Sequence, residues 1–406
     1  MTVDVRTVSE AEFPAWVAAM RAGFLGHAAE GEAEVRRVSA HLDRTWGAFD
    51  GDRVVGTLRS WPCELTVPGG AAVPVAALTN VTVSATHRRR GLLNRMMEPD
   101  LRFAKEQGEA ASILIAAEYP IYGRYGYGPA TQKVDLAVDA NAARFGERPP
   151  GSVELTDLTA LRKVGPALYE GVRARQPGAI TRTERWWDTT CELVTSPGEE
   201  PFKGYVVIGR DAAGEPDGYV RYKVDGRWQD GRPASSMEVV ELLAATPDAY
   251  ARLWRYCCEV DWVATVKAPD RCHEETLPWL LADARVITRT EQWDLLWLRP
   301  LDVASLLSAR RYLTDGRVVL EVVDPGGLAG GRFALEGGPD GASCKATSES
   351  PGLTLGVGEL GAVSLGDGSL RSLARAGRVD VHDPASLAIA DAMFRGEVAP
   401  WCSTWF

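Results

Sequence analysis

The stretch VTVSATHRRRGLL, residues 81–93, decides the fold prediction for this chain. Its β-branched start predicts a strand, and the spacing of apolar residues from about 91 to 107 predicts a helix. Free backbone N–H groups at a helix start, together with the helix dipole, favour a negatively charged ligand. Gly91 lets such a ligand approach the backbone closely. Three neighbouring side chains add positive charge suited to phosphate oxygens: Arg88, Arg89 and Arg90.

This junction predicts an anion site of a particular kind. A Walker loop is excluded because no Gly-Lys-Ser/Thr follows, and a dinucleotide GxGxxG is also absent. A surface arginine cluster without a ligand is the alternative. The strand before the arginines and the helix after them favour the anion site.

The length of 406 residues predicts two to three domains, each able to bury a core. We expect them at 1–150, 151–295 and 296–406. The first alternates helix and strand signals, including a helix over 10–25 and a buried strand, SILIAAE, over 112–118. Pro99 removes a backbone donor from the helix after Gly91, so a kink or break is expected there.

Two segments of the chain share one pattern of strand, turn and helix. They are VAALTNVTVSATHRRRGLLNRMME, residues 75–98, and MEVVELLAATPDAYARLWRYCCEV, residues 237–260. The second turn has neither a basic residue nor a glycine. If both are copies of one fold, only the first has the anion site. The last segment, with many glycines and alternating strands, predicts an α+β module.

The composition and net charge of the chain indicate which kinds of partner and ligand to expect. The 45 basic and 55 acidic side chains give a net charge of −10, which argues against nucleic acid and favours a cationic substrate. No apolar run approaches a membrane span, and the N-terminus is unlike a signal peptide, so we expect a soluble cytoplasmic protein. The seven cysteines lack a metal-binding or disulfide spacing, and no metal site is expected.

The strand and the R-x-x-G turn resemble the acetyl-CoA pyrophosphate loop of the GNAT superfamily of N-acetyltransferases. Together with IYGRYGYGPAT, residues 121–131, they resemble the Eis (enhanced intracellular survival) family over the whole chain. The resemblance implies an α/β and α+β fold. Two tandem GNAT domains, each with a mixed central sheet and flanking helices, would precede a C-terminal sterol-carrier-protein-like α+β domain. The second GNAT domain would be degenerate, and the assembly would be a homohexamer.

The resemblance also implies a reaction, acetyl transfer from acetyl-CoA to an amine, and a set of cofactor-binding residues. The backbone of one strand would pair with the pantetheine amides like an added strand. The loop after that strand would hold the pyrophosphate, and two residues at the end of the neighbouring strand would flank the cofactor. The strand residues are Val81, Thr82 and Val83, the loop residues are Arg88, Arg89, Arg90, Gly91, Leu92, Leu93 and Asn94, and the flanking residues are Ala117 and Glu118.

Aminolysis of a thioester needs a proton donor for the thiolate and a proton acceptor for the amine. Three tyrosines compete for the first role, and the family register selects Tyr127 over Tyr122 and Tyr125. For the second role the resemblance implies the α-carboxylate of Phe406. The final residues, WCSTWF (401–406), are too aromatic to stay in water, so we expect the terminus to be tucked into the protein. Burial for packing alone is the alternative.

Two positions bear on the acceptor. Aminoglycoside-acetylating relatives carry acids where this chain has Gly26 and Trp405, which weakens the prediction of a polycationic substrate. The amine could belong to an aminoglycoside, a polyamine, a peptide or a lysine. Two other functions stay open: a non-catalytic carrier of a CoA- or lipid-like ligand, and a silent scaffold that binds CoA.

Overall fold

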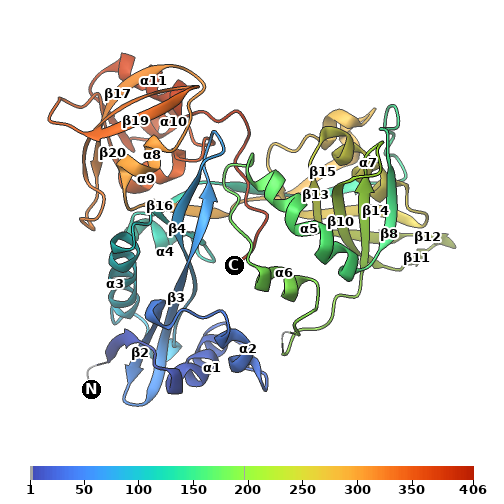
Figure 1. The fold of residues 1–406 in the computed structure, drawn as a ribbon, viewed down its shortest axis with the longest axis horizontal. Helices are drawn as coiled ribbons and strands as arrows, with labels where there is room; N and C mark the ends of the chain where they lie inside the picture. The colour runs from blue at the N-terminus through green and yellow to red at the C-terminus, as the bar shows by residue number, and fades with distance from the viewer. Residues whose placement is uncertain (1–2, 196) are drawn as a thin grey trace.

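The computed structural model describes residues 3–195 and 197–406 (Figure 1). Across these ranges it contains two seven-stranded sheets, one five-stranded sheet and a short two-stranded ribbon. Helices flank each of the larger sheets, as expected for a chain built from α/β and α+β units. No helix in the described ranges is both long enough and apolar enough to span a membrane.

The first sheet carries helices on both faces. Alternate residues of its strands belong to two clusters: Phe49 and Val54 pack with α1, while Ala48 and Val55 pack with α3. Its strand order is β1 (Asp4–Thr7), β2 (Thr45–Asp50), β3 (Arg53–Thr66), β4 (Ala72–Val83), β5 (Ala111–Ile115), β16 (Leu296–Pro300), β6 (Gly128–Pro129). The helices are α1 (Phe13–Gly23), α2 (Glu32–Arg37), α3 (Leu92–Glu106) and α4 (Tyr119–Tyr122).

The second sheet repeats the arrangement of the first. In both sheets the fourth and fifth strands, β4 with β5 and β13 with β14, run parallel, and a helix follows the fourth strand. Its strand order is β8 (Ser152–Thr156), β9 (Tyr205–Arg210), β10 (Pro216–Asp225), β13 (Ser235–Ala244), β14 (Val263–Cys272), β7 (Gln132–Asp139), β15 (Ile287–Asp294). The other elements are α5 (Leu158–Arg173), α6 (Glu184–Thr190), α7 (Pro247–Glu259), β11 (Trp228–Gln229) and β12 (Arg232–Pro233).

The two sheets exchange strands. The chain leaves the first sheet after β6 and enters the second as β7, between β14 and β15. It returns after β15 and adds β16 to the first sheet, antiparallel to β5. The predicted segment 1–150 therefore includes a strand of the second sheet, and the segment 296–406 begins with a strand of the first. The segment limits themselves stay a prediction.

The third unit packs its helices against a five-stranded sheet (upper left in Figure 1). Its strand order is β19 (Gly341–Ala346), β18 (Gly331–Gly338), β17 (Gly316–Val323), β20 (Leu353–Gly356), β21 (Val379–Val381). Its helices are α8 (Val303–Ser308), α9 (Val357–Val363), α10 (Leu370–Arg375) and α11 (Pro384–Phe394).

The structure differs from two local expectations, the break at Pro99 and the length of one strand. Helix α3 continues without a break through Pro99, because the buried side chains of Met96, Met97 and Leu101 hold both halves against the sheet. The strand predicted over 112–118 ends at Ile115.

One hydrophobic cluster joins all three units. It combines Leu65 and Ile113 of the first sheet with Ile180 from the chain after α5, Leu306 of α8 and Cys402 near the C-terminus. Figure 1 shows the C-terminus in the middle of the molecule, between β3 and the helices α5 and α6. The C-terminal segment is held in the protein at Cys402 and Thr404, which are buried, and Phe406 is half-buried. Trp405 is exposed, so the expectation that the terminal aromatic side chains leave water is met only in part.

Candidate functional site

Strands β4 and β5 separate partway along their length. They pair in parallel from Val75 with Ala111 to Leu78 with Leu114. Beyond this point β4 continues to Val83, whereas β5 ends at Ile115. Within the described residues, the backbone of Val81–Val83 is paired only on the β3 side, so its other edge is free to bind an extended ligand.

A β-bulge coincides with this separation. Leu58 of β3 alone lies opposite both Asn80 and Val81, because Thr57 pairs with Thr82 and Arg59 with Thr79. Asn80 has a left-handed backbone, with φ of 54°, and its carbonyl accepts a hydrogen bond of 2.8 Å from the Thr57 hydroxyl. Bulges bend a strand and redirect its side chains, so this one turns β4 away from β5. We did not predict it, although asparagine tolerates this backbone better than most residues.

The predicted anion loop is open to solvent. Arg88, Arg89 and Arg90 are exposed, and Gly91 begins α3 with φ of 72° and no side-chain cap. A Cβ on Gly91 would meet no atom within 4 Å, so the space beside the helix start is empty. Of these arginines, only Arg90 hydrogen-bonds within the described residues, to the Thr86 carbonyl at 3.3 Å. The arrangement presents free N–H groups and free guanidinium groups to one volume of solvent.

The remaining loop residues contribute differently. Leu92 is buried in the core and Leu93 is half-buried, so only their backbone N–H groups can serve a ligand. The side-chain oxygen of Asn94 accepts a hydrogen bond of 2.5 Å from the hydroxyl of Tyr125. Ala117 and Glu118 are exposed in a bend before α4 rather than at the end of β5, because the strand stops earlier than expected.

The three candidate tyrosines occupy different environments. Tyr127 is buried, and its hydroxyl lies 2.6 Å from the hydroxyl of Ser112 on β5. Burial raises the pKa of Tyr127 above the ordinary value of a phenol. Tyr122 packs edge-on against Tyr127, and burial raises its pKa to about 12. Tyr125 is half-buried and tied to α3 through Asn94. Ser112 was not predicted, since nothing in the sequence relates it to the tyrosine loop.

The third unit packs directly on the tyrosine loop. A Cβ on Gly128 would lie 1.9 Å from the carbonyl oxygen of Gly358 in α9, so only glycine fits there. Arg299 of β16 donates to the Tyr125 carbonyl at 2.5 Å and forms a buried ion pair of 3.0 Å with Asp324 of the third unit. The position of the loop therefore depends on Arg299, which is 174 positions from Tyr125, and on Gly358, which is 230 positions from Gly128.

The second unit holds the C-terminal residues. Arg182 is buried and donates to the Thr404 hydroxyl at 2.9 Å and to the Ser403 carbonyl at 3.2 Å. Its guanidinium lies 3.8 Å from the centre of the Tyr169 ring and 2.7 Å from a carboxylate oxygen of Glu241. These contacts fix the segment that leads to Phe406.

Phe406 reaches the first sheet. Its ring packs edge-on against Trp61 of β3, with ring centres 5.2 Å apart. Both residues line a cavity of about 650 Å³ that also includes Thr79 and Asn80 at the bulge. Phe406 packs in the same hydrophobic cluster as Ile113, and Tyr127 packs in the same cluster as Leu114. Because Ile113 and Leu114 are consecutive residues of β5, these two clusters lie on opposite faces of the strand. Tyr127 contacts Ser112 within the paired part of β4 and β5, whereas Phe406 lines the cavity at the bulge on the other face of the sheet.

Comparison with known proteins agrees with this architecture. Two family models described as "Acetyltransferase (GNAT) domain" match residues 4–130 and 178–300, and one described as "Sterol carrier protein domain" matches residues 303–403. An N-acetyltransferase Eis from Mycobacterium tuberculosis is 34% identical over 412 residues, which cover 98% of each chain. The chain belongs to the Eis family of GNAT N-acetyltransferases. The predicted family and fold class are confirmed.

Other relatives support the assignment over the full length. An uncharacterized N-acetyltransferase from Streptomyces avermitilis is 46% identical over 415 residues, covering 100% of this chain and 99% of the relative. The crystal structure of Eis1 from Mycobacterium abscessus superposes with a TM-score of 0.87 at 31% identity, covering 99% of this chain and 100% of the other. The protein is therefore an N-acetyltransferase, an acyltransferase whose GNAT fold implies acetyl-CoA as co-substrate.

Proposed function

We propose that this Eis-family protein transfers the acetyl group of acetyl-CoA to an amine at the parting of β4 and β5. The free edge of Val81–Val83, continuous with the uncapped start of α3, is the observation that carries the proposal. An extended pantetheine with two amides suits such an edge, and a pyrophosphate suits the helix start. Acetyl-CoA supplies an activated thioester when bound.

The cofactor roles implied by the family resemblance are consistent with this geometry. Val81, Thr82 and Val83 would pair with the pantetheine through their backbone. Exposed Arg88 and Arg89 would contact phosphate oxygens, joined by Arg90 when it leaves the Thr86 carbonyl. The N–H groups that begin α3 would complete the pyrophosphate site, contributed by Gly91, Leu92, Leu93 and Asn94. Ala117 and Glu118 would flank the opposite side.

Tyr127 would act as the general acid. Its raised pKa keeps the phenol protonated at neutral pH, so it has a proton to donate as the carbon–sulfur bond breaks. Ser112 orients the hydroxyl from 2.6 Å. Tyr122 and Tyr125 are the neighbouring alternatives, and the register of the family motif favours Tyr127 over both.

The α-carboxylate of Phe406 would act as the general base. An α-carboxyl group has an ordinary pKa of about 3.5, so it is ionised at neutral pH and can accept a proton from an ammonium or from the attacking amine. The contact between the rings of Phe406 and Trp61 holds the end of the chain against β3. The amine would reach the thioester from the cavity side and the proton donor from the α3 side.

The test is release of free thiol from acetyl-CoA in the presence of a panel of amines. The panel contains an aminoglycoside, spermidine, a dipeptide and a lysine-containing peptide. Thiol release that depends on one of these amines supports the proposal. Binding of CoA without thiol release from any of them would leave a scaffold function.

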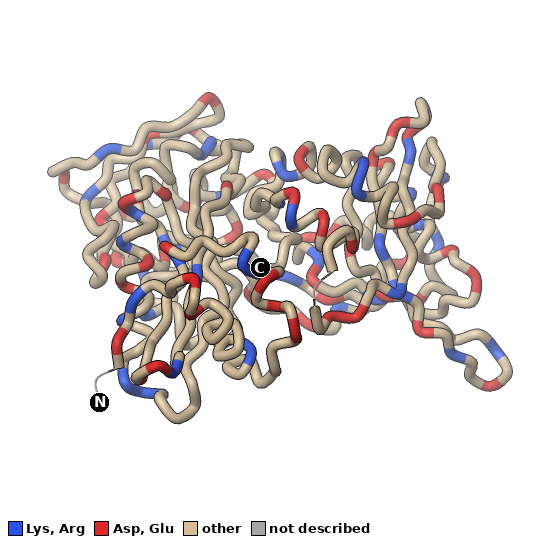
Figure 2. Tube along the Cα trace, turned by 60° about the horizontal axis from the view of Figure 1, so that its bottom comes forward, with Lys and Arg blue, Asp and Glu red and all other residues tan. Residues whose placement is uncertain are grey.

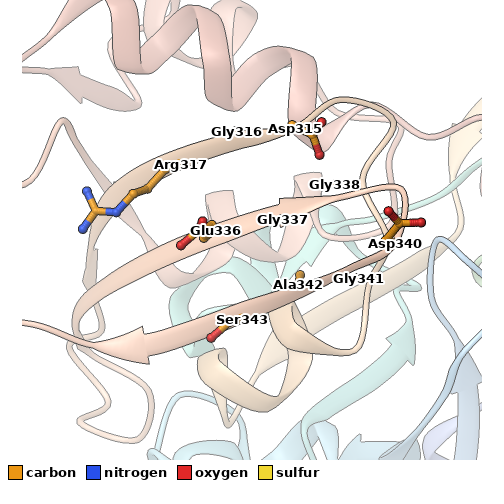
Figure 3. Close-up of a pocket in the computed structure, with 10 residues that line it drawn as sticks. All are labelled: Asp315, Gly316, Arg317, Glu336, Gly337, Gly338, Asp340, Gly341, Ala342 and Ser343. Atoms are coloured by element: carbon orange, nitrogen blue, oxygen red, sulfur yellow. The ribbon is translucent and has the colours of Figure 1, made fainter.

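The alternative of a lipid-like carrier has less support. A groove of about 540 Å³ crosses β17, β18 and β19 in the sterol-carrier-like unit (Figure 3). Figure 3 shows Asp315 and Asp340 at one end of it and Arg317 at the other, with glycines between. Charged groups and bare backbone in this groove do not favour an apolar ligand.

Assembly and location complete the proposal. A homohexamer, which the family resemblance implies, would give a mass six times the 44.0 kDa of one chain in light scattering. We place the enzyme in the cytoplasm, where acetyl-CoA is available. Fractionation of the native cells tests this placement.

A further inference from the structure

The cavity beside Phe406 is basic, although the protein as a whole is acidic. Figure 2 shows acidic and basic residues interspersed along the trace, without a segregated basic region. The cavity walls nevertheless combine four arginines with two glutamates and the α-carboxylate of Phe406, so four formal positive charges face three negative ones: Arg21, Arg36, Arg59, Arg185, Glu32, Glu199 and Phe406. A polycation would be repelled by this lining, whereas an anionic group would be attracted.

Most of these charges are already engaged. Glu32 is buried and accepts hydrogen bonds of 2.6 Å from Arg21 and 2.5 Å from Arg36. Burial disfavours its ionised form, yet the bonds from Arg36 and Arg21 outweigh that effect and lower the pKa of Glu32. Arg185 donates to the Val35 carbonyl at 3.2 Å. One carboxylate therefore serves two guanidinium groups, which leaves the wall with excess positive charge.

Arg59 differs from the other three arginines. Within the described residues its guanidinium forms neither an ion pair nor a hydrogen bond, and its Nε is buried without a partner. Burial and the nearby charge of Arg36 lower the pKa of Arg59 to about 10, so it stays charged at neutral pH. Arg59 is partly buried, and a charged group whose Nε is buried without a partner is unfavourable, so an anionic ligand would satisfy it. The Phe406 carboxylate forms no ion pair with it.

Arg59 lies next to the reacting centre. On β3 it pairs with Thr79, directly before the bulge at Asn80, and its guanidinium lies 5.6 Å from the centre of the Trp61 ring. The side-chain oxygen of Asn80 is also buried without a partner. The described residues of the same cavity therefore offer a guanidinium without a partner, from Arg59, and beside it a carbonyl oxygen without a partner, from Asn80, that can accept a hydrogen bond from an N–H group.

We infer that the acceptor is an amine that also carries a carboxylate, such as an amino acid or a short peptide, and that Arg59 binds this carboxylate. The inference rests on the proposed acetyl transfer and names its substrate class. Arg59 would hold the carboxylate by charge-assisted hydrogen bonds, and Asn80 would accept from the amine or a neighbouring amide. The neutral Trp405 beside Phe406 is consistent with a substrate of this charge.

The test compares glycylphenylalanine with glycylphenylalaninamide, which differ only at the carboxyl group. Calorimetry on the protein saturated with CoA should give at least about tenfold tighter binding of the carboxylate form, as expected for hydrogen bonds between charged groups. The same preference should appear in KM for thiol release from acetyl-CoA. The Arg59→Gln variant should bring the carboxylate form to the level of the amide.

Arg53→Gln is the matched control, because Arg53 is an exposed arginine at the start of the same strand and does not line the cavity. It should keep the preference. Equal binding of the two dipeptides, or a preference that survives Arg59→Gln, would overturn the inference. Turnover of spermidine without a preference for the carboxylate would overturn it while leaving the proposed function intact. Selective binding of the carboxylate form without thiol release would support the inference about the cavity and refute acetyl transfer.

Discussion

The junction between β4 and α3 and its counterpart between β13 and α7 share one geometry and differ in how the helix begins. Helix α3 starts at Gly91 with φ of 72° and no side-chain cap. Helix α7 starts at Thr246, whose hydroxyl accepts from the backbone N–H of Ala249 at 3.1 Å, and Asp248 adds negative charge to its first turn. The first helix start is available to an anion, whereas the second is occupied by its own side chain and repels one.

The second unit has a different task. Its buried Arg182 holds Ser403 and Thr404, and Tyr169 adds a contact of 3.0 Å between its hydroxyl and that of Thr404. The second unit, whose helix start is capped by its own side chain, thus positions the C-terminal segment. The first unit keeps a helix start that an anion can reach. Four experiments test whether the first unit binds the anion and the second unit positions the C-terminal segment.

The largest effect is expected from lengthening the chain by a few residues after Phe406. The α-carboxylate would move away from Trp61, so thiol release should fall to background while CoA binding persists. The same peptide added before Met1 is the control and should leave turnover intact. An active protein with the C-terminal addition would remove the carboxylate from the mechanism and reduce the second unit to a structural role.

Arg182→Ala should be strongly destabilising. It leaves Glu241 buried without its cationic partner, which typically costs about 3–5 kcal/mol in the free energy of unfolding. Urea denaturation measures this loss, and thiol release should fall as Thr404 loses its donor. Arg162→Ala on α5 removes only surface ion pairs and should cost less than about 1 kcal/mol. Similar losses in both variants would contradict the anchoring role.

The double substitution Arg88→Ala and Arg89→Ala should weaken acetyl-CoA binding by at least about tenfold, because charge-assisted hydrogen bonds to phosphate would be lost. Calorimetry gives the dissociation constant directly. Arg102→Ala serves as the control, since Arg102 is an exposed arginine of α3, the helix that follows the loop, and pairs with Glu98. An unchanged dissociation constant in the double variant would show that the pyrophosphate lies elsewhere.

Thr246→Ala should have the smallest effect. Loss of the cap at the start of α7 costs about 1 kcal/mol of stability in urea denaturation. The number of CoA molecules bound per chain should stay the same, because the junction still lacks arginines and keeps Asp248. If calorimetry instead showed a second CoA bound to each chain, the Thr246 hydroxyl alone would be what prevents an anion from binding at the start of α7.

Local chemistry made part of this structure predictable. The β4–α3 junction and the matching β13–α7 junction follow from short-range signals such as β-branched runs, glycine and helix starts. The end of β5 at Ile115 did not follow, because the apolar residues after it resemble a continuing strand. Pro99 gave the wrong expectation since tertiary packing of Met96 and Leu101 outweighs one lost hydrogen bond.

The parts of the site that depend on distant residues could not be predicted. Ser112 meets Tyr127, Arg299 meets Tyr125, and Arg182 meets Thr404 only after the sheets have assembled. Asparagine tolerates a left-handed backbone, which is visible in the sequence at Asn80. The bulge itself depends on how β4 pairs with β3, and this pairing joins residues far apart in the sequence. Among the described residues, Arg59 likewise lacks a carboxylate partner because Glu32 pairs with Arg21 and Arg36, which only the folded structure shows.

The strand exchange between the sheets also constrains biosynthesis. The first sheet lacks its sixth strand until residues 296–300 have left the ribosome, and the second sheet needs β7, which is made before the rest of it. Neither unit can complete its hydrogen-bonded ladder alone during translation, so folding is delayed until almost three quarters of the chain exists. Any proteolytic cut between β7 and β16 would leave both sheets dependent on strands from two fragments. Separate expression of either acetyltransferase unit should therefore yield chains with an unpaired strand edge that is prone to aggregate.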